Sequence, residues 1–415
     1  MSPGAMRNTA MALDCLPLGY CTNVHPAQTF AELLGGLDRY TVPVMRRVGR
    51  PMAAGLWLAR PVADEVLVAP DGPARLAAEL SARGLTVHTL NAFPYGDFHA
   101  ARVKENVYLP DWASAERLVY TERCAAVLAG LLPEGGAGSI STLPIGFKGF
   151  DRAPGFLQAA EHLTDCALTL ARIAGGTGRT IRLAIEPEPF CLLETTEETI
   201  EFFHVLWGVA SARGAEDVVR EHIGVCYDVC HQAVEFEDPA ACVATLDRAG
   251  VRVNKVQVSC AIELSDPADN SEGRAALRRF IEPRYLHQVF ARLRDGRTVG
   301  AVDLTAEFLD APGPEFRAAE TWRVHFHVPV DAERIGALGT TRSALRPALA
   351  AIADLNYAPH VEVETYTWAV LPGEGAHDLV TGLANEINAT QRLIDEIPVR
   401  STGSGRATPG VAAPS

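Results

Sequence analysis

The side chains best suited to chemistry in this sequence are three carboxylates and one amide that end or lie within short apolar runs. Glu186 closes Leu-Ala-Ile-Glu, Asp228 closes Val-Cys-Tyr-Asp, Gln257 lies within Lys-Val-Gln-Val, and Glu364 closes Val-Glu-Val-Glu. If these runs are neighbouring parallel strands, their carboxyl ends meet around one cavity. Burying three charges there is unfavourable unless a cation neutralises them. We therefore predict a divalent metal site formed by these four residues.

The ligand types indicate the ion and the chemistry. Carboxylate and amide oxygens suit Mg²⁺ or Mn²⁺, and exchange of one ligand for histidine would favour Zn²⁺ or Co²⁺. An ion that binds the carbonyl and the adjacent hydroxyl of a hydroxy-ketone stabilises the enediolate formed when a base removes a carbon-bound proton. Glu186 and Glu364 would be the catalytic pair, one removing the proton and the other returning it.

A further set of polar and aromatic side chains is predicted to contact the substrate. His231 follows Asp228 by three residues and is expected to bind substrate rather than metal. His325 and His327 share one face of a strand-like segment, and both a solvent-exposed strand and a second group of ligands remain open for them. The expected substrate contacts are His231, Phe93, Tyr95, His99, Lys255, His325 and His327.

The elements that must position these residues alternate between strands and helices. Eight apolar runs lack the simple alternation of a strand with one wet face, so we interpret them as strands buried on both sides. Helical patterns separate them, for example at 73–83 and 238–249, which favours a parallel sheet. The glycine-rich segment 175–178 comes between a helix and a strand, the wrong order for dinucleotide binding. A closed (β/α)8 barrel therefore explains the pattern best, with strands at 18–22, 53–59, 85–91, 139–144, 181–186, 223–228, 253–259 and 360–365.

We predict a single TIM-barrel domain over residues 13–398 with two insertions at its carboxyl-terminal rim. Segments 91–112 and 260–330 exceed the minimal barrel and are expected to cover the mouth. Residues 1–12 are expected to be flexible, and residues 399–415 are too poor in apolar side chains to pack and are expected to be disordered.

Three elements are predicted inside the second insertion, and one helix at the end of the barrel. The insertion is expected to contain a helix at 275–293, a hairpin at 298–309 and a strand at 323–329. The last helix is expected at 377–397, with an apolar stripe that stops before Pro398.

Composition and charge exclude several classes of protein. Hydrophobic residues make up 48% of the 415 residues and charged residues 21%, so the chain can bury a sizeable core. Its formal net charge of −14 disfavours nucleic acids and anionic membrane surfaces as partners. No apolar stretch is long enough to span a bilayer and no secretory signal pattern is found, so we expect a cytoplasmic protein. Nine scattered cysteines indicate reduced, mostly buried thiols.

The same motifs resemble a known family. Glu186 in Ile-Glu-Pro, Asp228-x-x-His231, Val-Gln257-Val and Glu364 are similar to those of the xylose-isomerase-like TIM barrels, which include hydroxypyruvate isomerase, ketose 3-epimerases and endonuclease IV. The resemblance implies a metal ion held by these four residues, with the two glutamates also moving protons. Gln257 stands where epimerases usually have histidine, as it does in hydroxypyruvate isomerase.

A narrower resemblance spans most of the chain. The blocks Gly-Tyr-Cys-Thr-Asn-Val-His-Pro, Asn-Ala-Phe-Pro-Tyr-Gly-Asp-Phe-His and Val-His-Phe-His-Val-Pro, which begin at residues 19, 91 and 324, resemble the EboE-type metabolite traffic proteins. That resemblance implies no particular reaction.

Three functions follow as hypotheses. The leading one is a metal-dependent aldose-ketose isomerase or epimerase acting on a sugar or sugar-like small molecule. The second is a non-catalytic barrel that binds or hands on a metabolite. The third is an endonuclease IV-like zinc phosphodiesterase using His88, His231, His325 and His327, which the acidic charge disfavours for DNA. The sequence does not indicate the oligomeric state.

Overall fold

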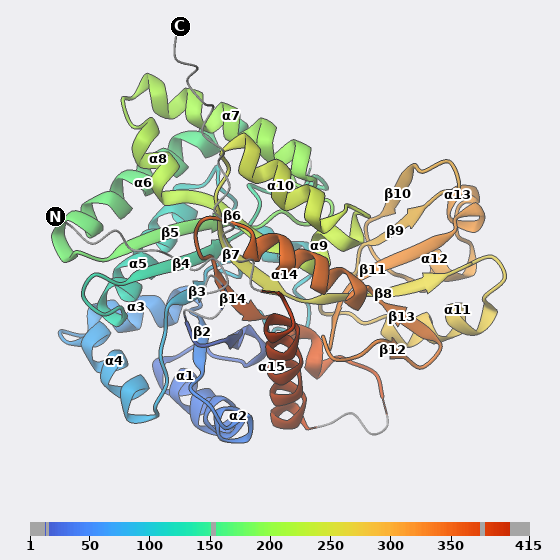
Figure 1. The fold of residues 1–415 in the computed structure, drawn as a ribbon, viewed down its shortest axis with the longest axis horizontal. Helices are drawn as coiled ribbons and strands as arrows, with labels where there is room; N and C mark the ends of the chain where they lie inside the picture. The colour runs from blue at the N-terminus through green and yellow to red at the C-terminus, as the bar shows by residue number, and fades with distance from the viewer. Residues whose placement is uncertain (1–12, 14–15, 151–154, 374–377, 399–415) are drawn as a thin grey trace, which may run out of the picture.

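The computed structural model describes residues 13, 16–150, 155–373 and 378–398. The expectations for segments 1–12 and 399–415 lie outside these residues, as does the first residue of the helix predicted at 377–397. Figure 1 shows a barrel with its surrounding helices and, on one side, a smaller sheet with short helices of its own.

Eight parallel strands close into the barrel, in the order β1-β14-β7-β6-β5-β4-β3-β2. The (β/α)8 fold and all eight strand positions predicted from the sequence are therefore confirmed. The side chains of these strands are almost all buried, which explains why their sequences lack the alternation of a one-faced sheet. The strands are β1 (Gly19–Cys21), β2 (Ala53–Trp57), β3 (Thr89–Asn91), β4 (Ala137–Thr142), β5 (Thr180–Ile185), β6 (Ile223–Asp228), β7 (Val253–Val258) and β14 (His360–Val363).

Helices cover the outside of the barrel, and local signals fix their ends. The longest begin at side-chain caps or end at glycine: Thr195 and Glu198 form a capping box on α7, and Gly178 ends α6 in a left-handed conformation with φ of 68°. The helices predicted at 73–83, 238–249 and 377–397 correspond to α4, α10 and α15. The helices of the barrel are α1 (Phe30–Gly36), α2 (Val42–Val48), α3 (Arg60–Val68), α4 (Gly72–Ala82), α5 (Ala115–Leu131), α6 (Phe156–Thr177), α7 (Thr196–Ala212), α8 (Glu216–His222), α9 (Val229–Val234), α10 (Pro239–Ala249), α14 (Leu345–Ala353) and α15 (Leu379–Asp395).

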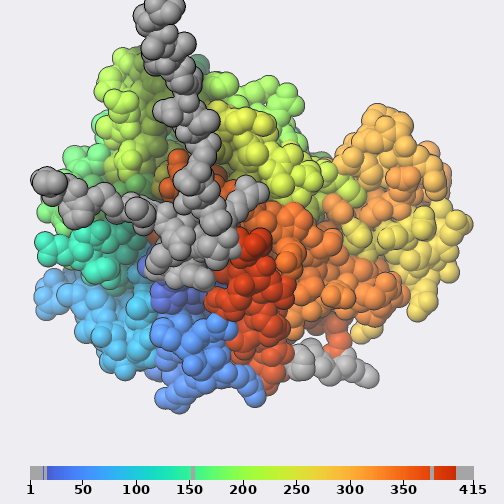
Figure 2. All heavy atoms as spheres, viewed as in Figure 1, coloured from blue at the N-terminus to red at the C-terminus, as the bar shows by residue number. Residues whose placement is uncertain are grey.

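The chain between β7 and α14 forms a second, six-stranded sheet in the order β10-β9-β11-β8-β13-β12. Its central strand, β11, carries His325 and His327 and matches the strand predicted at 323–329. Figure 2 shows this insertion, in yellow and orange, as a lobe beside the barrel. Its elements are β8 (Cys260–Ser265), α11 (Ser271–Leu277), β9 (Val289–Arg292), β10 (Thr298–Ala301), α12 (Ala306–Asp310), α13 (Pro314–Ala318), β11 (Thr321–Val328), β12 (Arg334–Ile335) and β13 (Leu338–Thr340).

Two elements predicted within the insertion are wrong. The helix expected at 275–293 ends as α11 at Leu277, and its last residues form β9, which pairs with β10 and β11. The hairpin expected at 298–309 lies earlier in the chain, because β10 forms an antiparallel pair with the preceding strand β9. Residues Ala306–Asp310 form the helix α12 instead. Pairing with β11 buries Val289 and Ala291 completely, and this tertiary gain overrides the local helical preference.

The loop after β3 meets the insertion at the carboxyl end of the barrel. The amides of Val103 and Lys104 both donate to the carbonyl oxygen of Arg284, at 2.8 and 2.7 Å. The Lys104 ammonium group forms an ion pair with Asp303 at 2.6 Å and donates to the carbonyl oxygen of Glu282 at 3.2 Å. Two segments that are far apart in the sequence are thus joined above the strand ends.

The cysteines and helices agree with two further expectations from composition. The eight cysteines that the structure describes are all buried and free. Among the described helices, none combines the length and the apolar character that a membrane span requires.

Candidate metal centre and active site

Three carboxylates come together where strands β5, β6 and β14 end. Glu186 follows β5, Asp228 is the last residue of β6, and Glu364 follows β14. One oxygen atom from each lies within 4.8 Å of the others, and all three side chains are buried. These separations allow one cation to contact all three residues.

The unpaired atoms of this centre also fit a cation. Oε2 of Glu186 and Oδ2 of Asp228 have no hydrogen-bond partner among the described residues. Gln257, whose Cα is in register with Asp228 across β6 and β7, is fully buried and has no partner for either atom of its amide. Buried polar atoms are rarely left unpaired, and a bound cation would account for the three unpaired oxygen atoms of Glu186, Asp228 and Gln257.

Burial and mutual repulsion disfavour the charged form of these carboxylates. Burial raises the pKa of Glu186 well above its usual range, and the charges of Glu364 and Asp228 raise it further. Burial and the charge of Asp228 raise the pKa of Glu364 to about 8. A divalent cation would reverse both effects, because it neutralises the charge that burial penalises.

Two asparagines distinguish Glu364 from Glu186. Asn23, after β1, and Asn91, at the end of β3, both donate to Oε1 of Glu364, at 2.8 and 3.1 Å. The two donors occupy the acceptor positions of that oxygen, so Oε2 alone remains for a metal ion or a proton. Glu186 forms no hydrogen bond of this kind through its Oε2.

Three buried histidines flank the carboxylates. Nδ1 of His231 lies 2.9 Å from the carbonyl oxygen of Pro187, and Nδ1 of His327 lies 2.8 Å from that of Glu364. Nδ1 of His325 lies 2.7 Å from Oε1 of Gln288. Burial lowers the pKa of all three rings, that of His327 to about 4, so they are neutral at pH 7. Because His325 and His327 are 2% and 0% exposed, the interpretation of their segment as a solvent-exposed strand is wrong.

A pocket opens above the carboxylates. Its floor is polar and its walls are aromatic and aliphatic, with contributions from the loop after β3 and from the insertion. The one lysine or arginine side chain among its lining residues is Lys104, which is already paired with Asp303. The lining residues are Asn23, Asn91, Phe93, Pro94, Phe98, Val103, Lys104, Val107, Tyr108, Glu186, Glu188, His231, Tyr285, Leu286, His325, Glu364 and Tyr366.

Of the seven predicted substrate contacts, Phe93, His231 and His325 line this pocket, whereas Tyr95, His99, Lys255 and His327 do not. Lys255 is fully buried in the barrel, ion-paired with Glu362 at 2.5 Å. The Tyr95 hydroxyl accepts a hydrogen bond from Arg60 at 2.8 Å, and its ring packs on Tyr120. We therefore withdraw Lys255 and Tyr95 as substrate contacts, because their polar groups are engaged elsewhere.

The positions of His99 and His88 contradict the roles that the sequence predicted for them. Nε2 of His99 donates to the carbonyl oxygen of Asn23 at 2.8 Å, so His99 supports the asparagine that binds Glu364 instead of contacting the pocket itself. His88 precedes β3 and packs against His360, the first residue of β14, at the amino-terminal end of the barrel. The zinc phosphodiesterase hypothesis required His88 in the metal cluster, and that requirement is not met.

Sequence reasoning missed several polar residues of the site, namely Asn23, Asn91, Glu188, Tyr108 and Gln288. Tyr108 donates to Oε1 of Glu188 at 2.8 Å, and Gln288 donates to the Tyr108 hydroxyl at 3.2 Å. The one available signal was position: Asn91 ends a barrel strand and Glu188 follows Glu186 by two residues.

The topology defines an eight-stranded α/β barrel that carries a cluster of carboxylates at the carboxyl ends of its strands. A xylose isomerase-like TIM barrel protein from Mycobacterium smegmatis, solved in complex with magnesium, is similar over 94% of this chain and 98% of its own, with 11% identity and a TM-score of 0.51. At this identity the likeness shows the fold alone.

Two other solved structures are similar at slightly lower TM-scores. One is an L-ribulose 3-epimerase, with 13% identity over 94% of this chain and 99% of its own, and a TM-score of 0.47. The other is the IolI protein with a bound zinc atom, with 12% identity over 93% and 100% of the two chains and a TM-score of 0.49. No model of a known protein family and no curated protein matches the sequence.

Proposed function

We propose that this protein is a metal-dependent isomerase or epimerase that acts on a sugar or a sugar-like small molecule. The observation that carries the proposal is the meeting of three buried carboxylates, Glu186, Asp228 and Glu364, directly beneath a pocket at the carboxyl end of the barrel. In barrels of this architecture the reaction takes place at that end.

The four predicted ligands, Glu186, Asp228, Gln257 and Glu364, would hold the ion, and their oxygen atoms favour Mg²⁺ or Mn²⁺. When bound, such an ion polarises a carbonyl and the hydroxyl next to it. The acidity of the adjacent C–H bond then rises, and a side-chain base within reach of that carbon can remove the proton.

The chain offers two groups for this proton transfer. Oε2 of Glu186 has no hydrogen-bond partner in the described part of the chain, so Glu186 is the group freest to remove the proton. Glu364 lies within 4.8 Å of it and offers Oε2 alone, since Asn23 and Asn91 engage Oε1. Delivery of a proton from a protonated Glu364 to the opposite face of the same carbon, while Glu186 keeps the proton it removed, would give epimerisation. Return of the removed proton by Glu186 to the neighbouring carbon, with transfer of a hydroxyl proton between the two substrate oxygens, would give isomerisation.

The walls of the pocket support an uncharged substrate. Phe93, Phe98 and Tyr108 supply aromatic faces on which a sugar ring can stack. Lys104 cannot neutralise a phosphate without giving up Asp303. Nε2 of His325 has no partner among the described residues and can accept a hydrogen bond from a substrate hydroxyl. We propose no nucleic-acid or membrane partner.

Solvent proton exchange tests the proposal. The metal-loaded protein in D2O, incubated with a panel of unphosphorylated ketoses and aldoses, should introduce deuterium next to the carbonyl of at least one of them. Glu186→Gln should reduce the exchange rate by at least about 10²-fold, the scale expected for loss of a general base. Arg102→Gln, on the surface of the loop after β3, is the matched control and should leave the rate unchanged.

The alternative, a barrel that binds or hands on a metabolite, makes the opposite prediction. A sugar that binds in a metal-dependent manner and never exchanges its carbon-bound hydrogen would contradict the enzyme and support the carrier.

A further inference from the structure

Glu386 is a buried carboxylate that neither the proposed metal centre nor the proposed proton transfer uses. It lies on α15, the last helix of the barrel, and its side chain is completely buried. An acidic side chain is rarely buried in this way unless hydrogen bonds or charges satisfy it. The partners of Glu386 therefore indicate what it does in the fold.

Three groups from two segments donate hydrogen bonds to this carboxylate. Oε1 accepts from the hydroxyl of Thr365 at 2.6 Å and from the amide of Val330 at 3.1 Å, and Oε2 accepts from the indole of Trp368 at 2.9 Å. The amide and the indole can only donate, so each oxygen of Glu386 must be free to accept. Burial raises the pKa of Glu386 to about 7, and these three hydrogen bonds oppose that rise.

The first of these segments begins at Glu364, which lies just beyond the strand that brings it to the site. β14 ends one residue before Glu364, whose amide donates to the carbonyl oxygen of Val258 at 3.1 Å. The chain then leaves the barrel, because Thr365 leads into the 3₁₀ turn Tyr366–Ala369. The barrel thus fixes the backbone before Glu364, and the hydrogen bond from Thr365 to Glu386 fixes the backbone after it.

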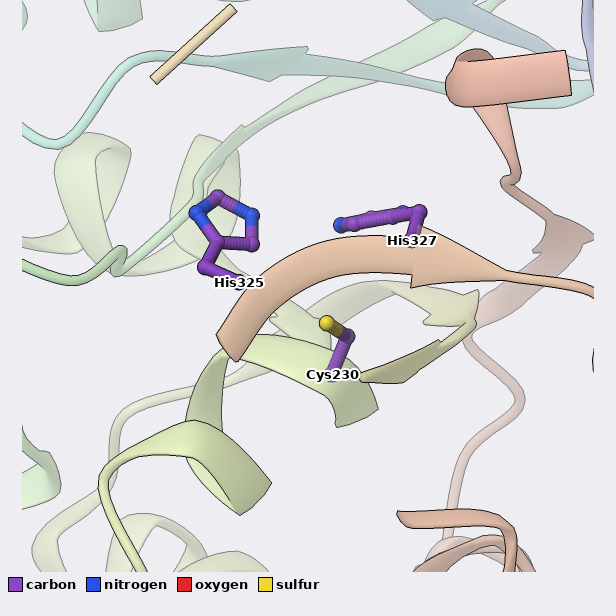
Figure 3. A group of neighbouring side chains, drawn as sticks. All are labelled: Cys230, His325 and His327. Atoms are coloured by element: carbon purple, nitrogen blue, oxygen red, sulfur yellow. The ribbon is translucent and has the colours of Figure 1, made fainter. Parts of the chain in front are cut away.

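The second segment follows β11 and belongs to the insertion. Val330, which donates to Glu386, comes two residues after β11. His327 of β11 lies with Nδ1 2.8 Å from the carbonyl oxygen of Glu364, and Figure 3 shows its ring projecting from the strand beside that of His325. The carboxylate of Glu386 therefore joins the last helix to both segments that hold the backbone of Glu364.

A glycine on α15 lets the turn after Glu364 pack closely against the helix. A Cβ atom on Gly382 would overlap the ring of Trp368, so a larger residue there would displace the indole. Gly382 and Glu386 are four residues apart and so lie on the same face of the helix. The indole packs on the glycine while its N–H group donates to the carboxylate. The position of the turn on the helix is thus set by both shape and hydrogen bonding.

We propose that Glu386 is a positioning residue, which holds Glu364 in place by anchoring Thr365, the residue that follows it. Glu386 is not among the residues that line the pocket, so it acts through Glu364 and not on the substrate. This role rests on the proposed function, because it treats Glu364 as a metal ligand. Loss of a residue that orients a ligand typically weakens metal binding 10- to 100-fold.

Metal affinity and amide exchange of the full-length protein test this role. Glu386→Gln keeps the size of the side chain but replaces one acceptor oxygen by an amide group, which cannot accept. The Kd of this variant for Mn²⁺, measured by equilibrium dialysis, should be about 10- to 100-fold higher than that of the wild type. In the metal-free variant, hydrogen–deuterium exchange of residues 360–369 should be faster than in the metal-free wild type.

Two further variants identify the route by which Glu386 acts. Thr365→Val removes the hydrogen bond to Glu386 and should raise the Kd for Mn²⁺ by a similar factor, and combining it with Glu386→Gln should add little. Ile387→Ala is the matched control on the same helix. It removes a buried side chain and destabilises the fold, yet it should leave the Kd unchanged because Ile387 is not bonded to Thr365.

The outcomes separate this role from the proposed function. Equal Mn²⁺ affinity in the wild type and in a folded Glu386→Gln variant would overturn it, and so would an equal loss of affinity in Ile387→Ala. If Glu386→Gln does not fold, Thr365→Val decides by the same two measurements. A wild-type protein that binds no Mn²⁺ would contradict the proposed metal centre. Amide exchange would then still decide, since unchanged exchange of residues 360–369 would show that Glu386 does not hold Glu364.

Discussion

Glu364 is held differently from every other carboxylate of the site. Its Oε1 accepts from the amide of Asn23, just after β1, and from that of Asn91, at the end of β3, whereas Oε2 of Glu186 has no partner among the described residues. Hydrogen bonds from amides stabilise the charged form of a carboxylate, so Asn23 opposes the burial that raises the pKa of Glu364. Asn23 is therefore a positioning residue that acts through Glu364.

Replacement of Asn23 tests this role. Within the part of the chain that the structure describes, Oδ1 of Asn23 has no partner, so Asn23→Leu removes chiefly the donor to Glu364. The pKa of Glu364 should rise, and the limb of the pH profile of kcat/KM that reports Glu364 should move upward by about one pH unit, the equivalent of one hydrogen bond to a charged group. A lower rate with an unshifted profile would mean that Asn23 has only a structural role.

The residue types of the site could be predicted only in part. Glu186, Asp228 and Glu364 were found because each ends a strand, and the ends of parallel strands meet wherever the chain runs between them. Asn23 and His99 act through contacts with distant segments, which no local pattern reveals. Lys255 has the strand position of a site residue, but it lies below the mouth and neutralises Glu362.

The elements of the barrel were predictable, whereas in the insertion the strand β11 was predicted and the helix at 275–293 and the hairpin at 298–309 were predicted wrongly. Barrel strands are buried on both faces, so apolar content alone indicates them, and capped helices separate them. In the insertion, the segment 275–293 carries helix-forming residues, yet Pro283 cannot continue a helix. The strand β9 is stabilised by pairing with residues that come 29 to 35 positions later, since Arg292 pairs with Thr321 and Val289 with Val324. Pairing between distant strands is invisible to a local pattern.

The ion pair of Lys104 and Asp303 forms a bridge between the loop after β3 and the insertion, and this bridge should affect substrate binding. Lys104 holds a positive φ of 41° while its ammonium group pairs with Asp303, so this side chain joins the two walls of the pocket alongside the two backbone hydrogen bonds to Arg284. Lys104→Met should let the walls separate and lower kcat/KM roughly 10- to 100-fold, mainly through KM, while metal content stays unchanged. Steady-state kinetics and metal analysis of the same preparation would measure both.

A matched control is available within the same loop. Arg102 pairs with Glu105, three residues away, and so does not reach the insertion. Arg102→Met removes one positive charge from the loop without breaking the bridge, and its kinetics should match the wild type. Equal losses in both variants would mean that the charge of the loop matters and the bridge does not.

At the scale of the whole molecule, a chain of net charge −14 concentrates buried carboxylates at one end of its barrel. Burial raises the pKa of Glu188 to about 8, as it does that of Glu364, and it raises the pKa of Glu386 to about 7. Other buried groups act in the opposite direction: burial lowers the pKa of His88 and His327 to about 4. The stability of the metal-free protein should therefore decrease both when the pH rises and when it falls.

Above pH 6.5, the buried carboxylates determine how the free energy of unfolding changes with pH. Between their unfolded pKa of 4.5 and their folded pKa of about 8, the folded state holds protons that the unfolded state has lost, so raising the pH destabilises the fold. The buried histidines destabilise it only below 6.5, where the unfolded state gains the protons. The free energy of unfolding of the chelator-treated protein, measured by denaturant titration, should thus fall from pH 6.5 to pH 8.

Added Mn²⁺ replaces these protons, so the stabilisation of the fold by Mn²⁺ should grow between pH 6.5 and pH 8 and reach about 2.7 kcal/mol at a hundred times its Kd. Glu186→Gln removes one of the buried charges and should flatten the metal-free decline; a metal-free stability that rises towards pH 8 would contradict the placement of these charges in one unneutralised cluster.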